Sequence, residues 1–122
     1  MTTRSFHESS EWQTGLRAYF EYRDLGIVEA TKGKVRAHVI RAAGSCPGPG
    51  GYRTHDLEFQ MNQVLKRSTR VDFEDDGEVR FEAGDSCCRA PMIKHGALEF
   101  SDDFEVIEIT MPADFPTADA QR

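Results

Sequence analysis

The sequence predicts an all-β protein built from short antiparallel strands. Apolar or β-branched residues alternate strictly with charged ones at residues 69–74 and again at residues 78–82, which is the period of half-buried strands. Asp75-Asp76-Gly77 between them is a hairpin turn of the Asp-Gly kind. Turn-forming Gly, Asp and Pro residues recur at spacings of roughly 8–12 residues along the chain, which is typical of a β-sandwich or barrel.

Length and charge limit the classes of function. A chain of 122 residues is enough for one buried core, and its net charge of −6 repels phosphate backbones and anionic lipids. Nucleic acid and membrane are therefore not expected partners. No run approaches the ~20 apolar residues of a membrane span, and no signal peptide opens the chain. Three cysteines do not make a disulfide framework, so we expect a cytoplasmic protein.

The N-terminal half contains one clear strand. We expect residues 1–15 to be a flexible arm whose Trp12 docks on the body or on a second subunit, and the barrel to occupy residues 16–112. Residues 16–22 are too short and aromatic to predict a helix. Apolar residues alternate with polar ones over 35–39, which predicts a half-buried strand with His38 exposed or at an edge.

The remaining elements follow in order. Residues 44–51 hold four glycines and two prolines and must form a loop; a phosphate-binding loop is not expected because no Lys-Ser/Thr and no helical pattern follows. Strands are predicted at 60–66, at 98–100 and at 104–111, where Pro112 ends the last one. Residues 113–122 are predicted to be an extended or frayed tail.

Two motifs flank the central hairpin. The first runs Gly51-x-x-x-His55-x-x-x-x-Gln60, and the second holds Ala83-Gly84-Asp85, then a Pro, then His95. Together they resemble the two motifs of the cupin superfamily, over residues 34–111. The resemblance implies a single jelly-roll β-barrel, a homodimer, and a divalent metal (Zn, Fe, Ni or Mn) held in the barrel mouth by His55, Gln60 and His95.

The match to the family motifs is partial. Arg67 stands at the family's turn glycine, Ala90 at its proline and Met92 at the glycine before the last histidine, and these changes cost conformational ease. Arg53 stands at the first histidine, which changes the chemistry of the site.

Arg53 has two consequences. Arginine has no lone pair for a metal, and its charge repels a nearby cation, so we expect metal binding to be weak or absent. A guanidinium is instead a good bidentate partner for a carboxylate, which favours a small acidic molecule as ligand. Arg53 shares a strand face with His55, so it either faces that ligand or is solvated.

Other residues complete the predicted pocket. Glu108 lies in a segment whose counterpart in the family often lines the pocket, and it would act as a general acid or base if burial raises its pKa; the alternative is an outward carboxylate on an edge strand. Tyr52 and Met92 are either pocket walls that bind substrate or core residues. Cys87 and Cys88 must point to opposite faces of one strand.

Two functions remain open at this point. The first is a metal-dependent enzyme acting on small oxygenated acids or uronate-like sugars. The second is a metal-free, degenerate cupin that binds or senses a small acidic molecule. The replaced histidine favours the second function, and the retained Gln60 and His95 favour the first.

Overall fold

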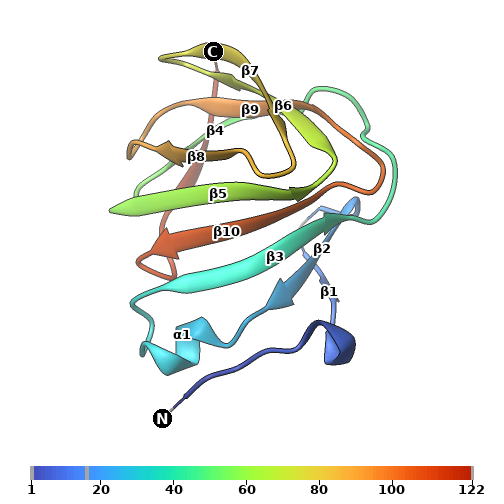
Figure 1. The fold of residues 1–122 in the computed structure, drawn as a ribbon. Helices are drawn as coiled ribbons and strands as arrows, with labels where there is room; N and C mark the ends of the chain where they lie inside the picture. Colours follow the sequence, from blue (N-terminus) through green and yellow to red (C-terminus); the bar gives the residue numbers. More distant parts are fainter. Residues whose placement is uncertain (1, 16, 122) are drawn as a thin grey trace.

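Eleven strands form two antiparallel sheets in the computed structural model, which describes residues 2–15 and 17–121 (Figure 1). The prediction of an all-β fold is confirmed. The six-stranded sheet has the order β1 (Gln13–Thr14), β2 (Phe20–Asp24), β3 (Arg36–Ala42), β10 (Glu105–Met111), β5 (Phe59–Lys66), β8 (Ser86–Arg89). The five-stranded sheet has the order β11 (Thr117–Ala120), β4 (Tyr52–His55), β9 (His95–Phe100), β6 (Ser68–Phe73), β7 (Gly77–Glu82).

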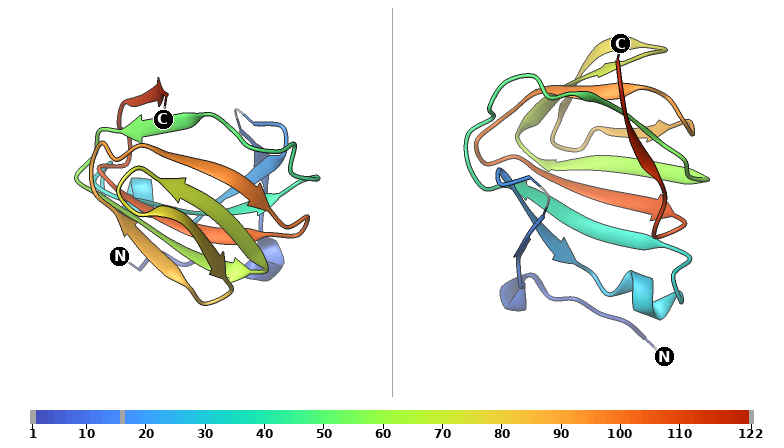
Figure 2. Two further views of the ribbon diagram at one scale, coloured as in Figure 1. Left: turned by 90° about the horizontal axis from the view of Figure 1, so that it is seen from above. Right: turned by 180° about the vertical axis from the view of Figure 1, so that it is seen from behind.

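The two sheets face each other and enclose the core (Figure 2). Val64 and Val106 reach it from the six-stranded sheet, Phe100 from the five-stranded sheet and Phe104 from the turn before β10. Full burial of a side chain of this size contributes about 1.5–3 kcal/mol. The core therefore joins strands that are distant in the sequence into one barrel.

The central hairpin forms as the sequence predicts. β6 and β7 pair from Ser68 opposite Glu82 to Phe73 opposite Gly77. Gly77 has a φ of 75°, a left-handed conformation that glycine adopts without steric cost. The Asp-Gly turn thereby fixes the register that points Phe81 inward.

Two regions differ from the sequence-based description. β3 is no edge strand, because β2 and β10 flank it. The tail beyond Pro112 contains β11, which pairs with β4 at the edge of the five-stranded sheet. The expected start of the barrel, Leu16, lies outside the described residues. In the N-terminal arm, Trp12 packs against the body, where the guanidinium carbon of Arg41 lies 3.9 Å from its ring centroid.

Two short helices lie outside the sheets: η1 (His7–Ser9) and α1 (Ile27–Ala30). In the described part of the chain no helix has the length and apolar character needed to cross a bilayer.

Two positions where the family resemblance expects glycine carry a left-handed backbone. Arg67 and Met92 both have a φ of 65°, although side chains with a Cβ disfavour this region. The turns of the family motifs are therefore retained in shape while their residues have changed, which supports the alignment of both motifs with this chain.

Candidate functional site

The barrel contains a cavity of about 280 Å³, lined by both sheets. It combines polar side chains, among them His55, His95, Arg89 and Glu108, with aromatic ones such as Tyr19 and Phe100. The two predicted histidines thus share one cavity. Their placement follows from strand order, because β4 and β9 are neighbours in the five-stranded sheet.

His55 and His95 lie close together. Their ring centroids are 4.8 Å apart, and Arg53, which precedes His55 by one inward position, pairs directly with His95 across the sheet. The prediction that these two imidazoles, far apart in the sequence, meet inside the barrel is confirmed.

The hydrogen bonds of His95 define its tautomer. Nδ1 lies 3.1 Å from the carbonyl oxygen of Ile93, so Nδ1–H donates to it. Nε2 lies 3.3 Å from Nη1 of Arg89 and accepts from that guanidinium. Burial first, and the charge of Arg89 second, lower the pKa of His95 to about 4. The ring is therefore neutral near pH 7. The lone pair on its Nε2 already accepts a hydrogen bond from Arg89.

His55 is held by the C-terminal segment. Its Nδ1 lies 2.8 Å from Oγ1 of Thr117 on β11, and its ring meets that of Phe115 edge-on at 5.3 Å. Burial, followed by the charge of Arg89, lowers the pKa of His55. The C-terminal segment, predicted to be an extended or frayed tail, thus positions one of the two histidines.

Glu108 lies on a central strand and lines the cavity, so the alternative of an outward carboxylate on an edge strand is wrong. Oε1 is 2.9 Å from Nε2 of His38, and Oε2 accepts from Nε2 of Gln60 at 3.0 Å. Burial raises the pKa of Glu108, but the hydrogen bond and charge of His38, with Arg89 and Gln60, outweigh it, and the net pKa is lowered. Glu108 is therefore a carboxylate at neutral pH, and the condition stated for its acid–base role, a pKa raised by burial, is not met.

His38 is a member of this cluster. Its side chain is only 15% exposed, and it pairs directly with Glu108 across β3 and β10. The expectation of an exposed or edge histidine is therefore wrong. Ala37 and Val39, which suggested a half-buried strand, are buried on the opposite face.

Gln60 is 2% exposed, and its side-chain amide N–H donates a hydrogen bond to Oε2 of Glu108. It belongs to the cluster of His38 and Glu108 rather than to the histidine pair. The sequence correctly places it on an inward strand position, but pairing of β5 with β10 directs its amide to the carboxylate.

Arg89 is the central residue that sequence reasoning missed. It ends β8, and its guanidinium lies beside His95 and 5.8 Å from the ring centroid of Phe73. In the orientation of the Asn62 side chain in which both its nitrogen and its oxygen are hydrogen-bonded, Oδ1 accepts from Nη2 of Arg89 at 3.1 Å. The signal available in the sequence was strand alternation, since residues two apart on a strand share a face and Arg89 therefore lies on the face of Cys87. In the structure Cys87 lines the cavity, whereas Cys88 is exposed.

The three residues predicted to contact substrate lie in three different places, and one of them lines the cavity. Arg53 lines the cavity. Tyr52, on the other face of β4, donates to Asp72 and packs beside Gly96. Met92 is 52% exposed at a turn, where its N–H donates to the carbonyl of His55. Tyr52 points away because neighbouring strand residues alternate.

The donor set fits a divalent metal poorly. Among residues 2–15 and 17–121, no three His, Cys, Asp or Glu side chains converge in a way that could hold an ion. The lone pair of His95 accepts from a guanidinium, and Gln60 is bonded to Glu108. Stable sites usually use three protein ligands, and a guanidinium next to the ion would repel it.

Comparisons with known proteins agree with this architecture. No protein-family model matches the sequence, and neither does any curated protein. Among solved structures, the polyketide cyclase RemF from Streptomyces resistomycificus superposes with a TM-score of 0.80 at 12% identity, covering 100% of this chain and 87% of that one. KdgF from Halomonas sp. gives a TM-score of 0.73 at 18% identity, covering 90% and 94%.

A third structure bears the family name predicted from the motifs. An RmlC-like cupin from Shewanella frigidimarina gives a TM-score of 0.68 at 20% identity, covering 93% of each chain. At these identities the likeness concerns the fold alone. Together with the two sheets and the retained motif turns, it identifies this chain as a protein of the cupin fold.

Proposed function

We propose that this protein binds a small acidic molecule in the barrel cavity, with the guanidinium of Arg89 holding the acid group, and that it does so without a resident divalent metal. The observation that carries the proposal is the position of Arg89, whose Nη1 lies 3.3 Å from Nε2 of His95 inside the cavity. A buried guanidinium is a strong, directional partner for a carboxylate.

The charges around Arg89 favour an anion. His55 and His95 have lowered pKa values, so both rings are neutral at pH 7. The positive charge in this part of the cavity therefore comes from arginine. Both oxygens of Glu108 are bonded to His38 and Gln60. In the described part of the chain, no ion pair joins Arg89 to a carboxylate. An incoming carboxylate would supply that partner.

Arg53 supports the same ligand from the opposite sheet. It lines the cavity and follows the same strand face as His55. Arg17 lines the cavity as well, and three guanidiniums facing one cavity suit an anionic group that approaches from the barrel mouth. The neighbour named as a polyketide cyclase is consistent with a small organic molecule as occupant, although this support is analogy at the level of fold.

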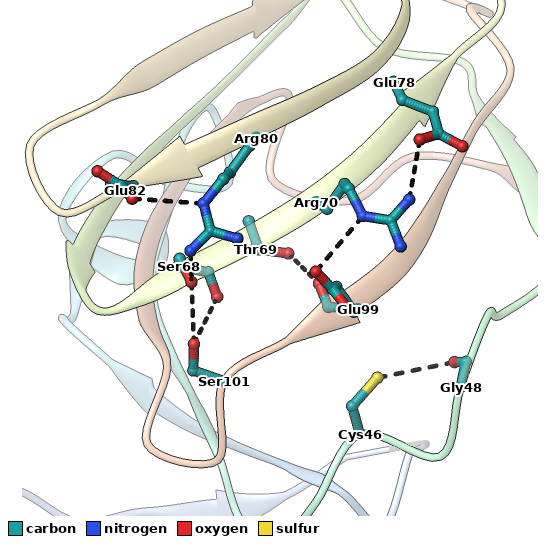
Figure 3. A network of polar contacts seen from close by, with 10 residues as sticks. All are labelled: Cys46, Gly48, Ser68, Thr69, Arg70, Glu78, Arg80, Glu82, Glu99 and Ser101. Atoms are coloured by element: carbon teal, nitrogen blue, oxygen red, sulfur yellow. Dashed lines mark hydrogen bonds and ion pairs between the residues drawn. The ribbon is translucent and has the colours of Figure 1, made fainter.

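Binding of simple carboxylates tests the proposal. Benzoate and D-glucuronate are titrated separately, and binding is followed by NMR and by thermal unfolding. At least one of the two acids should bind the wild type, and Arg89→Gln should lose that binding. Arg80→Gln is the matched control, since Arg80 bonds Glu82 and Ser68 on the outer face of β7 (Figure 3). Equal binding by Arg89→Gln and wild type would overturn the proposal.

Elemental analysis tests the metal-free part separately. Protein purified without chelators should contain little Zn, Fe, Ni or Mn. Near-stoichiometric metal that is lost in both His55→Ala and His95→Ala would instead support the metal-dependent alternative, with His55, Gln60 and His95 as its ligands.

A second candidate function is proton transfer by Glu108. The observation that favours it is a carboxylate, fixed by two hydrogen bonds, that faces the cavity; such a group acts as a general base when a substrate proton comes within reach. The test is exchange of the C3 protons of 2-oxo-4-phenylbutanoate with D₂O. Wild type should accelerate exchange and Glu108→Gln should not, while the exposed Glu58→Gln should behave as wild type. Exchange that is equally fast with Glu108→Gln would exclude this role.

A further inference from the structure

The cavity is divided into a polar layer and an apolar layer. Along β10 the inward residues change from Glu108 to Val106, and along β5 from Asn62 to Val64. Strand register places the members of each layer side by side, because Glu108 pairs with Asn62 and Val106 pairs with Val64. The polarity of the cavity therefore changes within two residues of strand, or about 7 Å.

On the opposite sheet one strand, β9, carries this change along its full length. On β9 the inward residues run from His95, in the polar layer, to Phe100 in the apolar core. On β6, Phe73 pairs with His95 and Thr69 pairs with Phe100, and the hydroxyl of Thr69 donates to the carbonyl of Glu99. β6 runs the other way, with Phe73 at the level of His95 and Thr69 at the level of Phe100, so on this wall β9 supplies both the polar end and the carbon surface.

Aromatic rings dominate the apolar layer. The centroid of Phe100 lies 5.6 Å from that of Tyr19 and 4.9 Å from that of Phe20, and all three rings line the cavity. These spacings match those at which aromatic side chains interact favourably. A ring entering this layer would extend an existing cluster.

The size of the cavity limits the occupant. A cavity of roughly 150 Å³ lined by apolar residues accepts benzene, and this one measures about 280 Å³. One or two fused rings with a carboxylate therefore fit its volume. A sugar acid of similar size would direct several hydroxyl groups toward Val64, Val106 and Phe100, whose side chains offer no hydrogen-bond partner, and the Tyr19 hydroxyl nearby already accepts from Arg17.

We propose that the occupant is an aromatic or alicyclic carboxylic acid of one or two rings, with its carboxylate at Arg89 and its ring system against Phe100 and Tyr19. This inference rests on the proposed function and names the class of molecule that the site takes. Val64 and Val106 lie one inward position beyond Asn62 and Glu108 and pack in one cluster with Phe100 and Tyr19, so a ring attached to the carboxylate would extend toward that cluster.

Calorimetric titration with three probes tests the inference. 2-Naphthoate should bind at least tenfold more tightly than D-glucuronate, which has the acid group but no ring. 2-Naphthalenemethanol, which has the ring but no charge, should bind at least tenfold more weakly than 2-naphthoate. Arg89→Gln should weaken 2-naphthoate binding at least tenfold, and the surface control Arg80→Gln should not change it.

Two ring variants keep the test independent of folding defects. Tyr19→Leu and Phe100→Leu keep an apolar side chain but remove a ring, and Tyr19→Leu also removes the hydroxyl that accepts from Arg17. Each should weaken 2-naphthoate binding about threefold to tenfold, and Phe100→Leu should leave D-glucuronate binding unchanged. Because Phe100 lies in the core, Phe100→Leu is used only if this variant unfolds cooperatively on heating. Tyr19 is half-buried, so Tyr19→Leu provides a binding measurement that leaves the buried core residues unchanged.

The outcomes distinguish this inference from the proposed function. If D-glucuronate binds as tightly as 2-naphthoate and both require Arg89, the acid site stands and the aromatic preference is wrong. If neither acid binds, or if the alcohol binds as tightly as 2-naphthoate, the acid site itself is wrong and the inference falls with it.

Discussion

Nη1 of Arg89 lies 3.3 Å from Nε2 of His95, so the nitrogen that would face a metal in this barrel instead accepts a hydrogen bond from a guanidinium. The other ring nitrogen donates to the carbonyl of Ile93. Both ring nitrogens of neutral His95 are thereby hydrogen-bonded. In the function proposed above, this pair turns a site that the sequence motifs associate with cations into one for an anion.

Removing the guanidinium should raise the pKa of His95. Burial and Arg89 hold this pKa at about 4, so in Arg89→Gln it should rise but stay below 6.5, because burial remains. The pKa of His55 should rise as well, since Arg89 also lowers it. Imidazole NMR titration measures both, with Arg80→Gln as control. An unchanged pKa of His95 would show that the guanidinium is not beside the ring in solution.

The same low pKa predicts a loss of stability in mild acid. Below pH 6.5 the unfolded chain protonates His95 while the folded protein does not, so stability is fully present above pH 6.5 and declines as the pH falls toward 4. The difference between 6.5 and about 4 corresponds to about 3 kcal/mol. Urea unfolding at a series of pH values from 7 to 4.5 should show most of this decline.

Two histidine variants make this prediction specific. His95→Asn should reduce the dependence of the unfolding free energy on pH, and His55, whose pKa is also lowered, should account for part of the slope that remains. His7→Asn, in the exposed N-terminal arm, should keep the wild-type slope. Equal slopes in all three proteins would mean that His95 is protonated alike in the folded and unfolded states.

Sequence patterns predicted the local features of this protein and the meeting of the two histidines, but not the network around them. Alternation and the Asp-Gly turn determined the β6–β7 hairpin because both are local. The His38–Glu108–Gln60 cluster depends on β10 lying between β3 and β5, an arrangement of strands distant in sequence. Arg89 was missed for the same reason, since its partners His95 and Asn62 lie on other strands.

The left-handed turn at Arg67 should be stabilised by glycine. A residue with a Cβ at a φ of 65° is disfavoured by about 1–2 kcal/mol, partly offset by the greater entropy of glycine in the unfolded chain. Loss of the exposed ion pair with Asp103 costs little. Arg67→Gly should therefore raise the unfolding free energy by up to about 1 kcal/mol, as measured in urea. Arg80→Gly, within β7, should lower it; a similar loss in both variants would contradict the argument.

We expect the protein to form the homodimer that the motif resemblance implies, through the outer face of the six-stranded sheet. Phe59 and Met111 pair across β5 and β10 and are 36% and 39% exposed, and covering such apolar area favours association. Met111→Glu should shift sedimentation toward the monomer, whereas Met92→Glu, at an exposed turn, should not. A wild type that sediments as a monomer at every concentration would refute the dimer.

Replacing two arginines of the cavity, Arg53 and Arg89, should create a metal site. Arg53 pairs with His95 and shares the face of His55, so Arg53→His would place a third imidazole beside them, enough for a site with three protein ligands. In that single variant Arg89 still repels the ion and still donates to His95. Arg53→His combined with Arg89→Gln should therefore bind Ni²⁺ or Zn²⁺ at least tenfold more tightly than Arg53→His alone.

Equilibrium dialysis with elemental analysis measures this gain, and His55→Ala in the double variant should abolish it. Arg89→Gln alone should bind metal weakly, because only two imidazoles are present. If the double variant binds no more metal than wild type, the three side chains do not converge and the repulsion by Arg89 is not what keeps metal out. If wild type already binds as tightly as the double variant, the guanidinium does not exclude cations, and the charge argument for an anionic ligand fails with it.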